Sequence, residues 1–200
     1  MPSHQPPGSV ILLNGTSSAG KTSLARAIQD HSGIPFVYWG IDTLFDLVPA
    51  NWGGGRDGPL SRHGFWYDRP GPDSDGRPVT VIRYGDVGRR MLESGCRAAA
   101  AFARGGDHLV IDEMLLTPDL MPVWSDALAG LRVTLVGVLC PLEVLEKREA
   151  TRKTEAGLAR GHLRTVHEHG RPYDLTVDTS ETAPGELADL VLRAHPVTAG

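Results

Sequence analysis

The residues best suited to chemistry form a glycine-bordered loop near the start of the chain, Gly15-Thr16-Ser17-Ser18-Ala19-Gly20-Lys21-Thr22. The loop matches the G-x-x-x-x-G-K-[ST] pattern, in which glycines let backbone amides point inward at a phosphate. The helix that follows adds the positive end of its dipole. Lys21 would reach the outer phosphates and the Thr22 hydroxyl would bind Mg²⁺. We therefore predict that ATP and Mg²⁺ are held by Gly15, Ser17, Ser18, Ala19, Gly20, Lys21, Thr22 and Ser23.

The surroundings of this loop favour a nucleotide site over a Gly-Ser turn that precedes Lys-Thr by chance. An apolar run at 10–13 comes before the loop, and a helical pattern starts near Lys21. Strand, loop and helix in this order are the setting in which phosphate-binding loops occur.

Three carboxylates follow apolar segments and are candidates for a role beside the phosphates. Asp112 directly follows the run at 109–111 and is a candidate ligand of Mg²⁺, against the alternative of a surface acid at a strand end. Glu113 could orient a water or the acceptor, or simply face solvent. Asp42 follows the second apolar run and could take the proton of an attacking hydroxyl, or cap the helix that begins beside it.

Basic residues gather between 147 and 164 in a chain whose net charge is −4. Arginines can stabilise charge on a transferring phosphate, and a mobile helical lid can exclude water. We expect Arg148 and Arg152, four residues apart, to act in this way. The alternative is a solvated helix face on which Glu149 and Glu155 pair with the cations. Three histidines in the same part of the chain lack metal-ligand spacing and are expected at the surface: His162, His167 and His169.

Alternating apolar and amphipathic segments must position these groups. Five strand-like runs are expected at 9–14, 36–41, 109–111, 133–139 and 175–177, with a short extra strand at 79–84. Helices are expected at 21–31, 42–48, 86–104, 118–128, 141–164 and 184–194. This order predicts an α/β protein whose five-stranded parallel sheet is covered by helices on both faces.

Residues 49–78 show no helical period and are rich in Gly, Pro, Asp and Arg. A long irregular stretch inside a compact domain is usually functional, so we expect 49–85 to be an insertion that forms the acceptor site, with the lid at 147–170. Aromatic side chains could stack on an acceptor ring or could pack the insertion against the body of the protein. The candidates for acceptor contact are Trp39, Trp52, Phe65, Trp66 and Glu113, and Tyr67 belongs to the same aromatic set.

Composition limits the remaining possibilities. The chain has 200 residues and suits one domain, 9–200, behind a disordered tail at 1–8. The tail lacks the apolar core of a signal peptide, and no apolar run is long enough to span a membrane. A pI near 6.0 does not indicate the overall basic charge that is typical of nucleic-acid-binding proteins. The two cysteines, Cys96 and Cys140, are expected to be buried and reduced. We expect a cytoplasmic protein, where ATP and Mg²⁺ are available.

Several motifs together make a more specific pattern, at 13–22, 39–44, 110–113, 148–152, 166–168, 173–174 and 177–179. This series resembles the chloramphenicol phosphotransferase family of antibiotic-modifying enzymes, over about residues 9–194. The resemblance implies a three-layer P-loop kinase fold with a helical lid, in which Asp42 is the general base, Lys21 the phosphate clamp, and Arg148 and Arg152 lid residues. The chain departs from the family where Asp112-Glu113 replaces a pair of aspartates, and 49–85 matches poorly.

The expected function is therefore ATP-dependent O-phosphorylation of a small-molecule alcohol, chloramphenicol or a related antibiotic, which would confer resistance by inactivation. Two alternatives stay open: a metabolic kinase for a sugar acid or nucleoside, and a nucleotide-binding regulatory module. A nucleic-acid 5′-end kinase is disfavoured by the acidic charge balance. The sequence does not indicate the oligomeric state.

Overall fold

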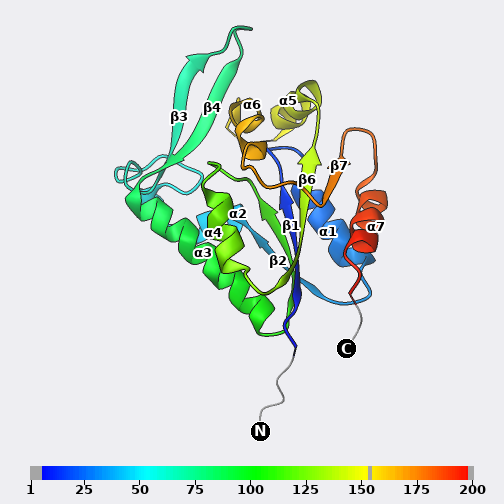
Figure 1. Ribbon diagram of the computed structural model, residues 1–200. Coiled ribbons are helices and arrows are strands. Elements are labelled where there is room, and N and C mark those ends of the chain that lie inside the picture. The colour runs from blue at the N-terminus through cyan, green and yellow to red at the C-terminus, as the bar shows by residue number, and fades with distance from the viewer. Residues whose placement is uncertain (1–5, 153–154, 198–200) are drawn as a thin grey trace.

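A five-stranded parallel sheet forms the centre of the protein, with the strand order β2-β5-β1-β6-β7 (Figure 1). The computed structural model describes residues 6–152 and 155–197. The strands are β1 (Ser9–Asn14), β2 (Phe36–Gly40), β5 (His108–Glu113), β6 (Arg132–Leu139) and β7 (Leu175–Asp178). The predicted α/β architecture is confirmed, while the expected tail falls mostly on residues 1–5, outside the described residues.

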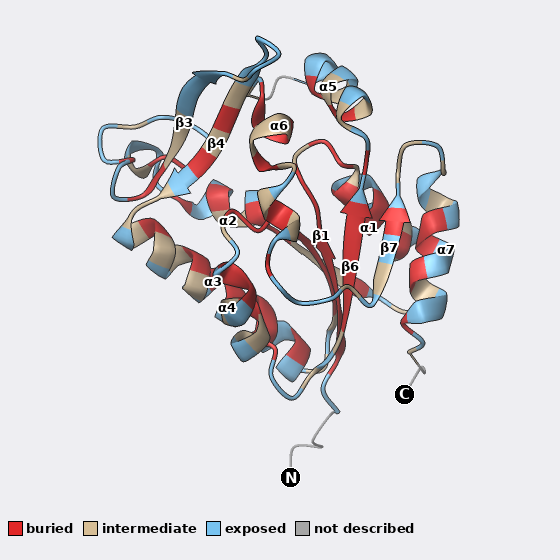
Figure 2. Ribbon diagram, turned by 45° about the horizontal axis from the view of Figure 1, so that its top comes forward, coloured by how far each residue is buried: buried red, intermediate tan, exposed pale blue. Residues whose placement is uncertain are grey.

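Helices cover both faces of the sheet because the buried strands alternate their side chains between two cores. In β1, Val10 and Leu12 belong to one core cluster, and Ile11 and Leu13 belong to the other. The first core lies under α3 (Asp86–Arg104) and α4 (Leu120–Ala127), and the second lies under α1 (Lys21–His31) and α7 (Pro184–Ala194). Figure 2 shows the central strands buried between these helices. Among the described residues, no helix is long and apolar enough to cross a lipid bilayer.

An antiparallel hairpin stands over the carboxyl edge of the sheet. It consists of β3 (Phe65–Pro72) and β4 (Pro78–Tyr84), preceded by a 3-10 turn, η1 (Ala50–Trp52). The expected strand at 79–84 is confirmed, but the prediction that 49–78 lacks regular structure is wrong for β3. The end of β3 is exposed and contains Pro70, Gly71 and Pro72, so it shows none of the alternation that marks a half-buried strand.

The helix expected at 141–164 is broken into two pieces, α5 (Leu142–Thr151) and α6 (Leu158–His162), followed by η2 (Thr165–His167). Arg152 is extended and ends α5, while Gly157 has a φ of 80° and begins α6. A side chain at Gly157 would put its Cβ 2.3 Å from the carbonyl oxygen of Pro78. The break therefore lets α6 lie directly against β4, while α2 (Ile41–Leu47) follows β2 at the same edge of the sheet.

Candidate active site

The loop at 15–22, hereafter the phosphate loop, joins β1 to α1 in a conformation that leaves amides free for an anion. Ser18 has a φ of 61° and Gly20 a φ of 88°, both in the left-handed region. A Cβ at Gly15 would lie 2.4 Å from the carbonyl oxygen of Val138, so this position requires glycine. The buried hydroxyl of Ser18 has no hydrogen-bond partner among the described residues. An unsatisfied donor beside left-handed backbone and Lys21 fits a bound phosphate group.

Lys21 and Asp112 meet at the end of the sheet beside this loop. The Nζ atom of Lys21 donates to the carbonyl oxygen of Thr16 at 2.9 Å and lies 3.7 Å from Oδ1 of Asp112. The hydroxyl of Thr22 donates to Oδ2 of Asp112 at 2.6 Å. Asp112 is buried, so the alternative of a surface acid is wrong. A hydroxyl and a carboxylate side by side are oxygen ligands that suit Mg²⁺, and these two residues would hold it.

Asp42 lies in the first turn of α2 and borders the same cleft. The helix is capped by Gly40 and not by Asp42, so the capping alternative is wrong. Although Asp42 is exposed, its partial desolvation in the cleft raises the pKa of the carboxyl, and the charge of Asp112 adds to this effect. Lys21 opposes the rise. A carboxylate with a raised pKa is a stronger proton acceptor.

One cleft of about 460 Å³ brings the phosphate loop, Asp42, Asp112 and Arg152 together. Its far wall comes from several elements that contribute Ile41, Phe45, Gly55, Tyr67, Ile82, Met114, Glu155 and Leu158. Gly55, Tyr67 and Ile82 lie in the segment expected to form the acceptor site, and Glu155 and Leu158 lie in the expected lid, but of these residues only Tyr67 belongs to the aromatic set named for acceptor contact. The apolar members of the wall carry no signal that separates a cleft residue from an ordinary core residue.

The five residues expected to contact the acceptor are not among those that line the cleft. Phe65 is buried with its ring against Phe45 at 5.0 Å, Trp39 packs near Phe102, and Trp52 packs on the core. Trp66 lies beneath the guanidinium of Arg62, at 4.8 Å. For Phe65 and Trp52, the structure agrees with the alternative in which aromatic side chains pack the insertion against the body.

Glu113 is also buried, so the alternative in which it faces solvent is wrong. Its carboxylate accepts from Nε1 of Trp124 and from the backbone N–H of Met114, both at 2.9 Å. Burial raises the pKa of Glu113 to about 7, which these two hydrogen bonds only partly oppose.

The two arginines expected in the lid both line a cavity that borders the phosphate loop. Arg148 donates to the side chain and the carbonyl oxygen of Thr179, at 3.0 and 2.5 Å. It lines a second cavity of about 400 Å³ between the phosphate loop and the segment 179–184. Arg152 follows the last residue of α5, so it does not share a helix face with Arg148, and it lines both cavities.

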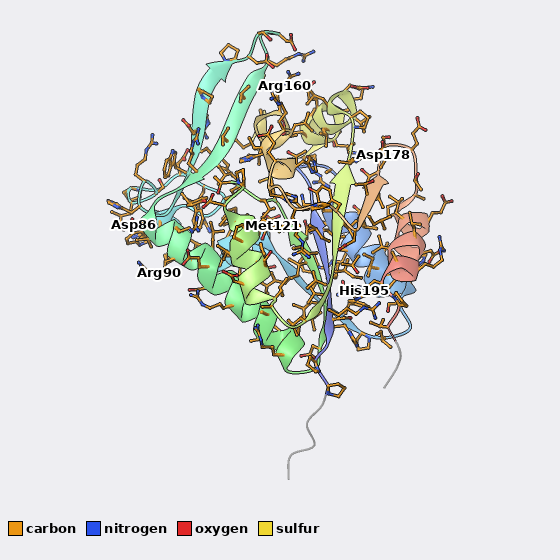
Figure 3. All side chains as sticks on the ribbon, in the orientation of Figure 1. Asp86, Arg90, Met121, Arg160, Asp178 and His195 are labelled. Carbon is orange, nitrogen blue, oxygen red and sulfur yellow. The ribbon has the colours of Figure 1, made fainter. Side chains whose placement is uncertain are left out.

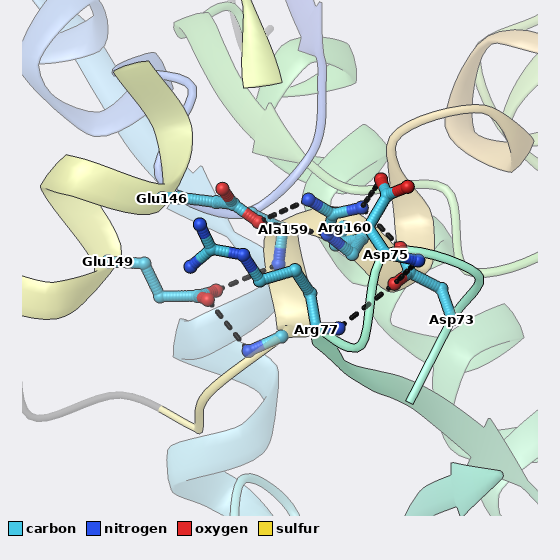
Figure 4. A network of polar contacts seen from close by, with 8 residues as sticks. Asp73, Asp75, Arg77, Glu146, Glu149, Ala159 and Arg160 are labelled. Carbon is cyan, nitrogen blue, oxygen red and sulfur yellow. Dashed lines mark hydrogen bonds and ion pairs between the residues drawn. The ribbon is translucent and has the colours of Figure 1, made fainter. Parts of the chain in front are cut away.

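The acids thought able to neutralise this basic segment are engaged elsewhere. Glu149 accepts from the backbone N–H groups of Gly157 and Ala159, at 2.7 and 2.8 Å, and Glu155 pairs with Arg69. Arg160 instead joins Glu146 of α5 to Asp73 and Asp75 at the hairpin tip (Figure 4). Figure 3 places Arg160 between the hairpin and the helices above the sheet. Ion pairs therefore hold the hairpin and α6 together over the cleft. Lys153, another basic residue of the segment 147–164, lies outside the described residues.

The prediction of surface histidines is wrong for two of the three. His162 is fully buried and accepts from the backbone N–H of Ile82 at 2.8 Å, and burial lowers its pKa to about 4. His169 is buried against Tyr173, and His167 is half-buried with its ring nitrogen 2.6 Å from the same hydroxyl. The segment after α6 packs on the sheet edge and covers these rings. Both cysteines are buried and free, as expected.

Comparison with known proteins gives one family and one fold. The profile described as chloramphenicol phosphotransferase-like protein matches residues 8–196. A provisionally named O-phosphotransferase of Mycobacterium tuberculosis (strain H37Rv) is 32% identical over 184 residues, which cover 92% of this chain and 80% of that protein.

Two solved structures are similar in fold at lower identity. An unliganded sugar kinase from Janibacter sp. superposes with a TM-score of 0.65 at 20% identity, over 96% of each chain. The APS kinase of Mycobacterium tuberculosis, in complex with AMPPNP and APS, gives a TM-score of 0.62 at 19% identity, over 96% of this chain and 99% of that one. These similarities establish the P-loop kinase fold.

Proposed function

The chain belongs to the chloramphenicol phosphotransferase-like family of phosphotransferases, and on that basis we propose that it moves the γ-phosphate of Mg-ATP to a hydroxyl of a small molecule. The observation that carries the proposal is the single cleft lined by Lys21, Thr22, Asp42, Asp112 and Arg152. It combines a phosphate-binding loop with a separate carboxylate, Asp42, in the same cleft.

Each group has a distinct role in this reaction. The hydroxyl of the acceptor loses its proton to Asp42 as its oxygen forms a bond to the phosphorus, and ADP leaves. Lys21 and Arg152 stabilise the charge on the phosphate oxygens. When bound by Thr22 and Asp112, Mg²⁺ neutralises further charge on the phosphates. The amides of the phosphate loop hold the triphosphate in position.

The acceptor end of the cleft supports a ligand without negative charge. Asp42 and Glu155 both border it, and Glu155 shares Arg69 with Asp57, at 2.7 and 3.3 Å. Among the described residues that line the cleft, the cations are Lys21 and Arg152, which the proposed reaction assigns to the phosphates, so no further cation faces an acceptor carboxylate or sulfate. Like charges in a cleft repel, so an anionic acceptor would bind poorly. This disfavours the alternative of a sugar acid.

The wall of this end supports an acceptor with an apolar or aromatic part. Its side chains are Phe45, Tyr67, Ile82, Met114 and Leu158. Chloramphenicol is a neutral aryl diol and has both features, so it or a related hydroxylated antibiotic is the proposed acceptor. A neutral nucleoside is the second candidate for the same reasons.

A mass-spectrometric acceptor screen tests the proposal. The protein is incubated with Mg-ATP and, separately, chloramphenicol, other hydroxylated antibiotics, nucleosides and sugar acids. We expect one neutral acceptor to gain a single phosphoryl group, and Lys21→Ala, confirmed as folded by its thermal unfolding, to give none. Release of ADP at the same rate with and without every acceptor would favour a nucleotide-hydrolysing regulatory module instead.

A further inference from the structure

A tyrosine on β2 reaches the carboxylate assigned to the metal. The hydroxyl of Tyr38 donates to Oδ2 of Asp112 at 3.1 Å, and the same oxygen accepts from Thr22 at 2.6 Å. In the sheet, Tyr38 pairs with Val110 while Asp112 pairs with Gly40. The tyrosine side chain therefore spans two residues along the strand to make this contact.

Two neighbouring groups hold the ring in this position. A Cβ at Gly40 would lie 2.7 Å from the Tyr38 hydroxyl, so the absence of a side chain at Gly40 leaves room for the hydroxyl. The guanidinium of Arg26, on α1, lies 4.3 Å from the centre of the Tyr38 ring. The ring therefore contacts α1 through Arg26, and its hydroxyl meets β5.

We propose that Tyr38 is a positioning residue that holds the Asp112 carboxylate in the orientation needed to bind Mg²⁺. The inference rests on the proposed function, because it concerns the metal of that reaction. A carboxylate oriented in advance loses less side-chain freedom when a metal binds, and partners of metal ligands commonly tune metal affinity for this reason.

The substitution Tyr38→Phe isolates this hydrogen bond, because it keeps the ring and its contact with Arg26. Calorimetry measures binding of ADP in EDTA, and then binding of Mg²⁺ to the complex of protein and ADP. We expect the Mg²⁺ dissociation constant to rise about tenfold, with ADP affinity in EDTA unchanged. The matched control is Tyr84→Phe, which removes a hydroxyl that pairs with Thr117 and with neither proposed metal ligand. The control should bind Mg²⁺ as the wild type does.

Two results would overturn the inference while leaving the proposed function intact. One is an unchanged Mg²⁺ affinity in Tyr38→Phe. The other is an equal loss of ADP affinity with and without Mg²⁺, which would indicate a general distortion of the loop. Failure of the wild-type protein to bind ADP under either condition would instead overturn the proposed function, and the role of Tyr38 with it.

Discussion

Replacement of Glu113 by glutamine should remove a pH dependence from the stability of this protein. Glu113 is buried, its pKa is raised to about 7, and an unfolded chain returns it to about 4.3. The folded protein therefore binds one more proton than the unfolded chain between these values. The stability that this proton contributes is fully present below about pH 4 and is lost as the pH rises through about 7.

The size of the effect follows from the difference between the two pKa values. The difference between a pKa of about 7 and one of about 4.3 corresponds to roughly 4 kcal/mol in total, because each pKa unit is worth about 1.4 kcal/mol. Glutamine keeps the shape but has one acceptor oxygen for the two donors, Trp124 Nε1 and Met114 N–H. The variant should lose about 1–3 kcal/mol for the unsatisfied donor, and this loss should not vary with pH.

Urea unfolding at several pH values from 5 to 8 measures both the pH-dependent contribution of the Glu113 proton and the constant loss from the unsatisfied donor. The difference in unfolding free energy, wild type minus Glu113→Gln, should fall by about 3 kcal/mol across this range, since other titrating groups cancel. A difference that stays constant with pH would refute the argument that burial raises the pKa of Glu113. Loss of acceptor binding with stability unchanged would instead indicate that Glu113 contacts the acceptor.

Three further predictions concern the cleft and the elements around it. Asp42→Asn should keep ATP affinity but lower turnover by ~10²–10⁴-fold. The rate of the wild-type protein should fall as acid protonates Asp42, with a pKa above that of an ordinary aspartate. An unchanged rate of the variant in stopped assays would exclude Asp42 as the base. Gly15→Ala should abolish ATP binding measured by calorimetry, because its Cβ would lie 2.4 Å from the carbonyl of Val138; normal affinity would contradict the geometry of the loop. Arg160→Met should speed amide hydrogen exchange in the hairpin more than in the sheet, because it releases Asp73 and Glu146; equal exchange would show that the network does not hold the hairpin.

The sheet and the phosphate loop could be predicted because their residues obey local rules. β1 is buried on both faces and is apolar throughout Val10–Leu13, a pattern that fits a central parallel strand. Gly15, Gly20 and Lys21 are set by backbone conformation and phosphate chemistry, which are properties of a short segment.

The acceptor wall could not be predicted because it depends on contacts between distant segments. Tyr67 reaches the cleft only because β3 pairs with β4, while Phe65, two residues earlier, is buried against Phe45. The helix break at Gly157 likewise depends on the carbonyl of Pro78, about eighty residues away in the chain. No local pattern distinguishes an aromatic residue that packs inward from one that meets a ligand.

The same limit applies to Tyr38. A tyrosine in a strand is ordinary, and only the register of β2 on β5 brings its hydroxyl to Asp112. The sequence indicates that a carboxylate stands at the end of β5, but not what orients it.

The ratio of ADP released to acceptor phosphorylated tests the central claim most directly. Both products are measured in one reaction of the wild-type protein with Mg-ATP and the acceptor identified by the screen. If the phosphate loop and Asp42 serve a single transfer, the ratio should be one to one, and ADP release should nearly cease when the acceptor is omitted. Nucleotide hydrolysis that continues unchanged without acceptor, or no turnover with any hydroxyl compound, would contradict the account.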